Sequence, residues 1–309
     1  MIKRTLYFGN PSYLSMQNEQ LVLKYPAVEK NDTLPAHFKS GVISTVPIED
    51  IGMVIIDHRQ ITITHDLCEK LIANNSVILW CDAKHQPTGM TLPLADNDTL
   101  AEKTRYQIEA SEPLKKQLWK QTVEAKILNQ AAVLEALGHT NKELKYLASQ
   151  VLSGDSTNTE GRSAAIYWKK LLEPYGTTRG QFDGYPNNLL NYGYAILRAT
   201  VSRALVSSGL LPVLGIHHRN KYNAYCLSDD IMEPYRPLVD LYLFAYIHNQ
   251  KSRSEILSKE DKNHILNLIN IDILLEGKNS PLMVAISRTT ASLMRCYMGE
   301  TRKIIYPEL

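Results

Sequence analysis

The amino-acid pattern changes near residue 94, and this change constrains the fold more than any other feature of the chain. The first part contains "TLYFGN", "YLSMQNEQLVLKY", "GVISTVPIEDIGMVIID" and "SVILWCD", which are rich in β-branched and aromatic residues and are separated by turn residues. That pattern is typical of strands. QNEQ predicts a hairpin tip, and Thr64 is expected to cap a short helix in "THDLCEKLIANN". We therefore predict a β-rich domain over residues 1–94.

Apolar residues recur at helical spacing in the rest of the chain. Ser111, followed by Glu and Pro, predicts the start of a long helix, and Gly138 predicts its end. Further helices are expected over 140–153, 161–174, 187–208, 231–249, 256–275 and 281–298. The predicted fold class is α+β, with a small N-terminal β-rich domain followed by a larger all-α domain over residues 95–309.

Composition bounds the class of protein. The 309 residues are 44% hydrophobic and 21% charged, which is typical of a globular chain. A net charge of +2 neither requires nor excludes a nucleic-acid partner. The four cysteines form no CxxC pair, which favours a reducing compartment. No apolar run approaches 18 residues and the N-terminus shows no cleavage signal, so we expect a cytoplasmic protein without a membrane span.

One stretch, "GIHHRNKYNAYCLSDDIMEPYRP" over residues 215–237, raises the question of a metal site. It places His217 and His218 upstream of a cluster that includes Asp230 and Glu233. The two acidic residues have the spacing of a capping box, which would make them structural. At that spacing they also share a helix face, where like charges repel unless a cation lies between them. The local pattern leaves both interpretations open.

A third carboxylate comes from "STNTEGRSAAIYWKKLL", where Glu160 begins a helix whose next turn has small residues. A glutamate there could simply complement the helix dipole. Together, one histidine and carboxylates from two helices form a mixed nitrogen and oxygen ligand set that suits Mn²⁺ or Mg²⁺. Such a site fits phosphodiester chemistry. The chain contains no GxSxG, GxxxxGK[ST] or GxGxxG motif, so neither a serine hydrolase nor use of nucleoside triphosphates is indicated.

Four segments resemble one protein family. They are "NTEGRSAAIYW" (158–168), "YPNNLLNYGYAIL" (185–197), "GIHHRNKYNAYCLSDDIMEPYRPLVD" (215–240) and the tail "YMGETRKIIYPEL". In this order they resemble the CRISPR-associated integrase of spacer acquisition, in the form that accompanies type II systems. "LWKQTVEAKILNQA" (118–131) is similar to the first long helix of that family.

The resemblance implies a set of site residues. It places the metal ligands and catalytic residues at Glu160, His218 and Glu233, and it implies Mn²⁺ or Mg²⁺ as the cofactor. Asp230 is expected as an auxiliary carboxylate, while the role of His217 is not fixed by the resemblance.

Other polar residues near the motifs have alternative interpretations. Asn188 could support the metal site or cap its helix. Five basic residues could meet DNA phosphates, although each could equally pair within the chain or face solvent: Arg198, Arg203, Arg219, Lys221 and Arg236.

The resemblance further implies insertion of a protospacer fragment into a CRISPR repeat array, by attack of a 3′-hydroxyl on a phosphodiester. It implies a homodimer formed through the β-rich domain, and a small CRISPR-associated partner protein. The tail over 300–309 could dock on that partner or be a frayed terminus. Two alternatives stay open, namely a metal-dependent nuclease of branched or single-stranded DNA and a non-catalytic DNA-binding scaffold.

Overall fold

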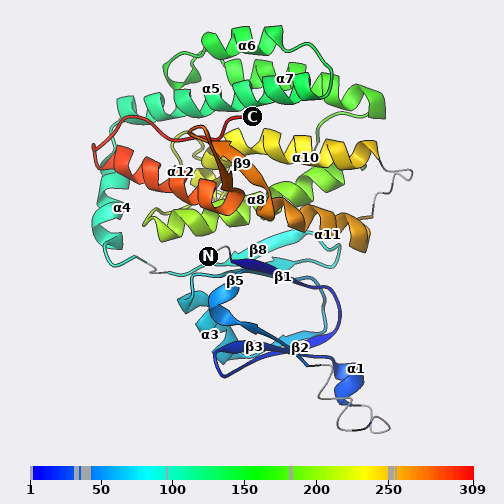
Figure 1. Ribbon diagram of the computed structural model, residues 1–309. Helices are drawn as coiled ribbons and strands as arrows, with labels where there is room; N and C mark the ends of the chain where they lie inside the picture. The colour runs from blue at the N-terminus through cyan, green and yellow to red at the C-terminus, as the bar shows by residue number, and fades with distance from the viewer. Residues whose placement is uncertain are drawn as a thin grey trace. The chain divides into compact units, whose positions relative to one another are not determined.

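The computed structural model describes residues 3–30, 35, 43–94, 97–180, 184–249, 254 and 256–309. The chain divides into two compact units, Met1–Asp96 and Asn97–Leu309. Strands dominate the first unit and helices the second, so the expected mixed α+β character is confirmed (Figure 1). The predicted boundary falls at residues 95 and 96, which lie outside the described residues.

The first sheet of the N-terminal unit is built around a fully buried strand. β5 (Ile51–Ile56) has six buried residues and lies parallel to both β1 (Arg4–Phe8) and β7 (Val77–Cys81). A strand that is apolar along its whole length is typical of a parallel sheet covered on both faces. β8 (Pro87–Thr91) closes one edge as an antiparallel partner of β7.

The second sheet has the order β4-β3-β2-β6. β2 (Ser12–Gln17) and β3 (Gln20–Lys24) form the expected hairpin, and its tip residues Asn18 and Glu19 have φ of 52° and 57°. β4 (Ser44–Pro47) pairs antiparallel with β3, and β6 (Ile61–Ile63) pairs parallel with β2.

Helices complete the N-terminal unit. α3 (His65–Ala73) has Thr64 as its N-cap, as predicted, and its Leu67 and Leu71 join a core with residues of both sheets. α1 (Pro26–Glu29) and a 3-10 turn, η1 (Ile48–Asp50), are the other helical pieces of the described residues.

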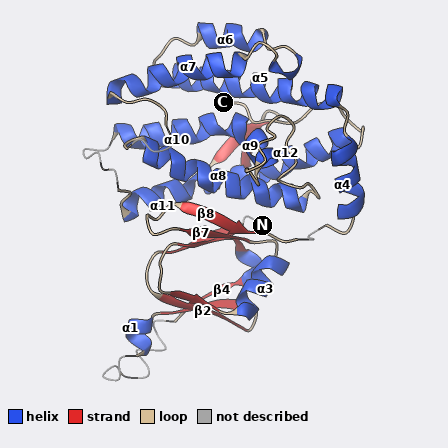
Figure 2. Ribbon diagram, turned by 180° about the vertical axis from the view of Figure 1, so that it is seen from behind, coloured by secondary structure: helices blue, strands red, loops and turns tan. Residues whose placement is uncertain are grey.

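The second unit consists mainly of layered helices. α5 (Glu112–Ala136) packs against α6 (Lys142–Ser149) and α7 (Thr159–Leu172), which lie together in Figure 1. α8 (Asn187–Ser207) packs against α10 (Arg236–His248) and α12 (Leu282–Tyr297) in a second layer. α9 (Cys226–Met232) lies beside α8, as the view from behind shows (Figure 2). The remaining helical elements are α4 (Leu100–Glu109), α11 (Lys259–Asn267) and the 3-10 turns η2 (Ser153–Asp155), η3 (Glu173–Tyr175), η4 (Glu233–Tyr235) and η5 (Leu268–Asn270).

The expectation of an all-α second domain is wrong. β9 (Asp272–Leu275) and β10 (Lys278–Pro281) form an antiparallel hairpin there, so the helix expected over 256–275 ends at Asn267. Glu276 and Gly277 have φ of 51° and 72°, the left-handed pair that a tight hairpin turn requires. The helix expected over 231–249 is also interrupted, because η4 separates α9 from α10.

The C-terminal tail is neither frayed nor free, because it packs on its own chain. The Gln121 side chain donates to the Arg302 carbonyl and accepts from the Ile304 N–H, both at 2.9 Å. Ile304 is only 3% exposed. The Tyr306 hydroxyl lies 2.8 Å from Thr122 Oγ1, so the tail follows one side of α5.

Candidate metal centre

One face of α5 carries buried polar side chains that the predicted ligands contact. Ser111 accepts a hydrogen bond from the Leu114 N–H and fixes the start of this helix. Trp119, Lys126 and Asn129 are all buried along it. Their spacing of seven and three residues puts them on one side of an α-helix. A buried lysine on that side needs a partner of opposite charge.

Lys126 finds two such partners. Its Nζ makes an ion pair with Glu160 Oε1, and it lies 2.5 Å from Glu233 Oε2. The side chains of Lys126 and Glu233 are 9% and 8% exposed, and that of Glu160 is 31% exposed. Burial alone would lower the pKa of Lys126, but Glu233 and Glu160 outweigh it and raise that pKa. The three residues therefore form one charged cluster, built from α5, α7 and η4.

Glu233 is held by a second cation. Arg236 Nε lies 3.0 Å from Glu233 Oε1. Burial would raise the pKa of Glu233, but Arg236 and Lys126 keep it below its usual value, so Glu233 is ionised. Neither Glu233 Oε2 nor Arg236 Nε has a partner in hydrogen-bond geometry, although both are buried. Glu233 is thus held by charge, with one oxygen that no hydrogen bond satisfies.

Glu160 is directed by the start of α7. Asp155 accepts from the N–H groups of Thr159 and Glu160 at 2.8 and 3.0 Å, and Asn158 accepts from that of Gly161. Because other side chains cap the helix, the Glu160 carboxylate is available to Lys126. Glu160 also lies in the first turn of α7, where its negative charge complements the helix dipole. The dipole does not account for its ion pair with Lys126.

His218 is oriented by Asp230. Its Nδ1 lies 2.5 Å from Asp230 Oδ1. Asp230 also accepts from the N–H groups of Ile216 and His217 at 2.6 and 2.9 Å. In the neutral ring, a proton on Nδ1 leaves the lone pair on Nε2. The hydrogen bond that His218 donates to Asp230 raises the pKa of His218, against the opposite effect of burial.

The capping-box interpretation of Asp230 and Glu233 is wrong. Asp230 lies inside α9 rather than at its N-cap, and its carboxylate accepts hydrogen bonds from the 216–218 loop. Gly215 lets that loop approach, since a Cβ there would lie 2.3 Å from the His218 carbonyl oxygen. The acidic residue therefore holds the histidine loop in place.

His217 has a packing role. Its ring stacks on Trp119 with centroids 4.3 Å apart and planes within 3°. Burial and the neighbouring His218 lower the pKa of His217, so its ring is neutral at pH 7. His218 meets the same indole edge-on, at 5.7 Å.

The predicted ligands come together around α5 without forming a closed shell. Glu233 is near enough to His218 to raise its pKa. Within the described ranges, however, no three His, Cys, Asp or Glu side chains are gathered closely enough to hold a metal ion. In the arrangement observed, the Lys126 ammonium is paired with both Glu160 and Glu233.

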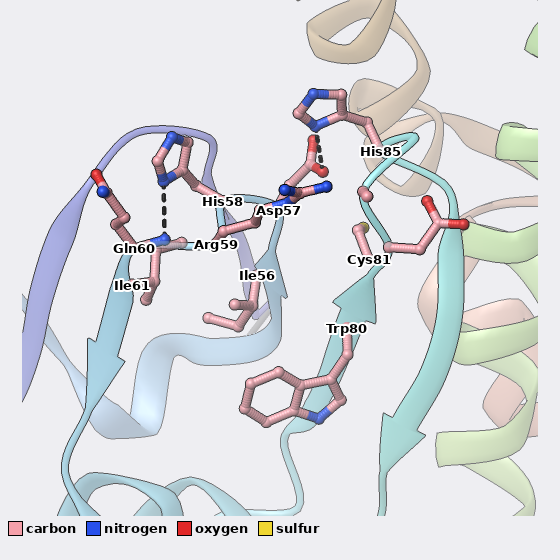
Figure 3. A pocket seen from close by; sticks show the side chains of 11 residues that line it. Ile56, Asp57, His58, Arg59, Gln60, Ile61, Trp80, Cys81 and His85 are labelled. Carbon is pink, nitrogen blue, oxygen red and sulfur yellow. Dashed lines mark hydrogen bonds and ion pairs between the residues drawn. The ribbon is translucent and has the colours of Figure 1, made fainter.

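A different pocket lies in the N-terminal unit. It has a volume of about 600 Å³ and lies at the ends of β5 and β7, where Figure 3 shows Asp57 and His85 facing each other. Asp57 is buried, and it accepts from the Tyr7 hydroxyl at 2.5 Å and lies 2.8 Å from His85 Nδ1. Both oxygens of Asp57 therefore bond within the chain and tie β1, β5 and the loop after β7 together.

Comparison with known proteins decides the family. The model of the family "CRISPR associated protein Cas1" matches residues 6–276. The CRISPR-associated endonuclease Cas1 of Neisseria meningitidis is 36% identical over 294 residues, which cover 94% of this chain and 91% of the relative. The chain belongs to the Cas1 family. The expected resemblance is thereby confirmed.

Solved structures share this Cas1 fold. A casposase bound to integration product has a TM-score of 0.76 at 21% identity, covering 98% of this chain and 92% of that one. A chain of a Cas6-RT-Cas1–Cas2 complex has a TM-score of 0.72 at 18% identity. The match covers 99% of this Cas1 chain and 36% of the chain in the complex. At these identities, the likeness concerns the fold.

The basic residues proposed for DNA have diverse surroundings in this Cas1 chain. Arg198 Nε lies 2.6 Å from Asp229 Oδ1, and Arg219 donates to both oxygens of Glu112 at 2.9 and 2.8 Å. Arg236 pairs with Glu233, as described above. Lys221 is exposed over the Tyr222 ring, and Arg203 is half-buried on α8.

Asn188 donates to the Ser254 carbonyl at 3.0 Å, which ties the start of α8 to the segment before α11.

Within the described helices, none is long and apolar enough to cross a membrane.

Sequence reasoning missed Lys126, Trp119 and Asn129. All three lie in the segment "LWKQTVEAKILNQA", whose helical pattern was recognised. The available signal was a lysine on the apolar side of the helix, one turn after Val123 and Thr122, which are buried. A charge in that position implies a buried counter-charge from elsewhere in the fold.

Proposed function

We propose that this member of the Cas1 family is a divalent-metal-dependent DNA integrase, which inserts short DNA fragments as spacers into a CRISPR array. The observation that carries the proposal is the pairing of Lys126 with both Glu160 and Glu233, beside a histidine oriented by Asp230. Two carboxylates from different elements that converge on one ammonium mark a place where a cation finds oxygen atoms from both.

The residues present fit Mn²⁺ or Mg²⁺. Glu160, Glu233 and Nε2 of His218 would supply oxygen and nitrogen ligands of the type these ions accept. Glu233 Oε2 already lies against one cation, the Lys126 ammonium at 2.5 Å, so this buried oxygen sits where the fold places positive charge. Asp230 would act as the partner that orients a ligating histidine through its other ring nitrogen.

The proposed reaction exchanges one phosphodiester for another. The 3′-hydroxyl of the incoming fragment forms a bond to phosphorus at the repeat border, and the bond to the departing strand breaks and releases a 3′-hydroxyl. A bound ion would neutralise the negative charge that develops on the phosphate during this exchange. Arg236 holds Glu233 ionised and in position, and Asp155 and Asn158 fix the turn that carries Glu160.

We further propose partners. The solved Cas1–Cas2 complex and the casposase bound to integration product support a small CRISPR-associated partner and a DNA substrate for this chain. A homodimer through the β-rich unit belongs to the same proposal. Light scattering of the purified chain tests it, with a dimer mass expected and a monomer mass contradicting it.

A strand-transfer assay tests the function. It uses a supercoiled CRISPR-array plasmid, a labelled short duplex, the small partner and Mn²⁺, with EDTA and His218→Ala as controls. Joined product is expected only with metal and the wild-type chain. Cutting without joining would identify a nuclease instead, and DNA binding without any reaction would identify a scaffold.

A further inference from the structure

We propose that Lys126 is the internal cation of this centre, which pairs Glu160 with Glu233 and competes with the divalent ion for them. The inference rests on the proposed function, because it assigns the same two carboxylates to metal binding. It adds a residue that sets the affinity of the centre for its metal.

Lys126 joins two elements that are distant in sequence. Its ammonium reaches Glu160 on α7 and Glu233 on η4, which are separated by 60 residues of chain. A divalent ion held by both carboxylates would need oxygen atoms that the ammonium now contacts, so the two cations would compete for them.

The two cations on Glu233 differ in what else they contact. Arg236 carries a planar guanidinium, is 26% exposed and lies 3.0 Å from Oε1. Lys126 contacts Oε2 and reaches Glu160 as well, through a flexible stem of four carbons. Because Lys126 is the cation that joins the two carboxylates, it is the group that a metal ion held by both would displace, while Arg236 would stay beside Oε1 of Glu233.

The charge of the cluster also depends on Lys126. Without Lys126, two carboxylates would face each other in a largely buried space, with only Glu233 neutralised by Arg236. Repulsion between like charges favours any cation that relieves it. Removing the ammonium should therefore tighten metal binding, whereas damage to the fold would weaken it. This opposite direction separates the proposal from a merely structural role.

The test is a calorimetric titration of Mn²⁺ into the full-length protein. We expect Lys126→Met to bind Mn²⁺ about 10- to 100-fold more tightly than the wild type, the range that changes next to metal ligands commonly produce. Lys120→Met is the matched control, because Lys120 lies on the same helix and pairs with Glu124 in a partly exposed position. Its affinity should equal that of the wild type. Unchanged or weaker binding by a folded Lys126→Met protein would overturn the proposal.

Two further measurements test the proposal even if Lys126→Met does not fold. Lys126→Gln removes the charge, keeps a polar but shorter side chain, and should also bind Mn²⁺ more tightly. In the wild type, the lysine ¹⁵Nζ resonance of Lys126 should shift when Mg²⁺ is added, and an unmoved resonance at saturating Mg²⁺ would contradict displacement. If Glu160→Gln and His218→Ala bind Mn²⁺ as the wild type does, the proposed metal centre itself fails. If they lose binding but neither Lys126 variant gains it, only the role of Lys126 fails.

Discussion

His218 Nδ1 lies 2.5 Å from Asp230 Oδ1, and the same carboxylate accepts hydrogen bonds from the loop that carries the histidine. Asp230 therefore fixes both the ring and its backbone, and it leaves Nε2 as the nitrogen available to a metal. Two of the acidic residues after the histidine pair have different roles. Asp230 orients the candidate ligand His218, whereas Glu233 is itself a candidate ligand.

Asp230→Asn should weaken Mn²⁺ binding and strand transfer by about 10- to 100-fold, because a neutral amide orients the His218 ring less strongly. Calorimetry and the joining assay measure the two effects. Asp229→Asn is the matched control, since Asp229 pairs with Arg198 and Asn223 instead. Equal metal affinity in both variants would contradict the assigned role of Asp230.

Gly215→Ala should displace the histidine loop. Its Cβ would lie 2.3 Å from the His218 carbonyl oxygen and 2.9 Å from Asp230 Oδ2, and a backbone atom cannot move aside cheaply. Overpacking of this kind costs about 1–3 kcal/mol of the free energy of unfolding. Urea unfolding measures that loss, and Mn²⁺ binding should fall with it. Gly89→Ala has open space around its Cβ and should change neither quantity.

Asn129 joins η4 to the C-terminal tail. Its side chain donates to the carbonyls of Pro234, the residue after Glu233, and Pro307 at 2.8 and 3.1 Å. Asn129→Ala leaves buried carbonyls without a donor, and we expect a loss of about 2–4 kcal/mol in the free energy of unfolding. Chemical denaturation checks this value. Asn249→Ala, which removes one exposed hydrogen bond at the end of α10, should cost less than about 1 kcal/mol.

Asp240 should make stability depend on pH. Burial raises its pKa to about 6, against the lowering effect of hydrogen bonds from Tyr194 and Tyr167. The folded protein thus keeps a proton that the unfolded chain releases near pH 4. The stabilisation is complete below about pH 4 and is lost as the pH rises through about 6, a change of about 3 kcal/mol.

The free energy of unfolding of Asp240→Asn should lack this component. The difference between wild type and variant, measured by urea unfolding at pH 4 and pH 7, isolates it from the other carboxyl groups. A difference that stays constant over this range would mean that Asp240 titrates normally in the fold.

The periodicity of apolar residues predicted the larger organisation of the chain. The prediction of a helix after α11 was wrong, and the sequence shows why. "DILLEGKNSP" alternates buried and exposed residues in β9, and Glu276–Gly277 forms the turn. A two-residue period flanking a glycine turn indicates a hairpin. The apolar run of β9 was assigned to a helix because it follows a helical segment without an obvious break.

The site shows a different limit. Glu160, His218 and Glu233 were named from the family resemblance, and the fold brings them to one face of α5. The pairing of Lys126 could not be inferred from its own neighbours in sequence, because its two partners lie 34 and 107 residues further along the chain. Only the tertiary packing of α7 and η4 on α5 creates that contact.

The most direct measurement is a crystal structure of the protein with Mn²⁺, recorded at the manganese absorption edge. Our account predicts an anomalous peak between the carboxylates of Glu160 and Glu233 and Nε2 of His218, with Lys126 Nζ moved away from it. A peak held by other residues, or a centre in which Lys126 still bridges both carboxylates at saturating Mn²⁺, would contradict the account.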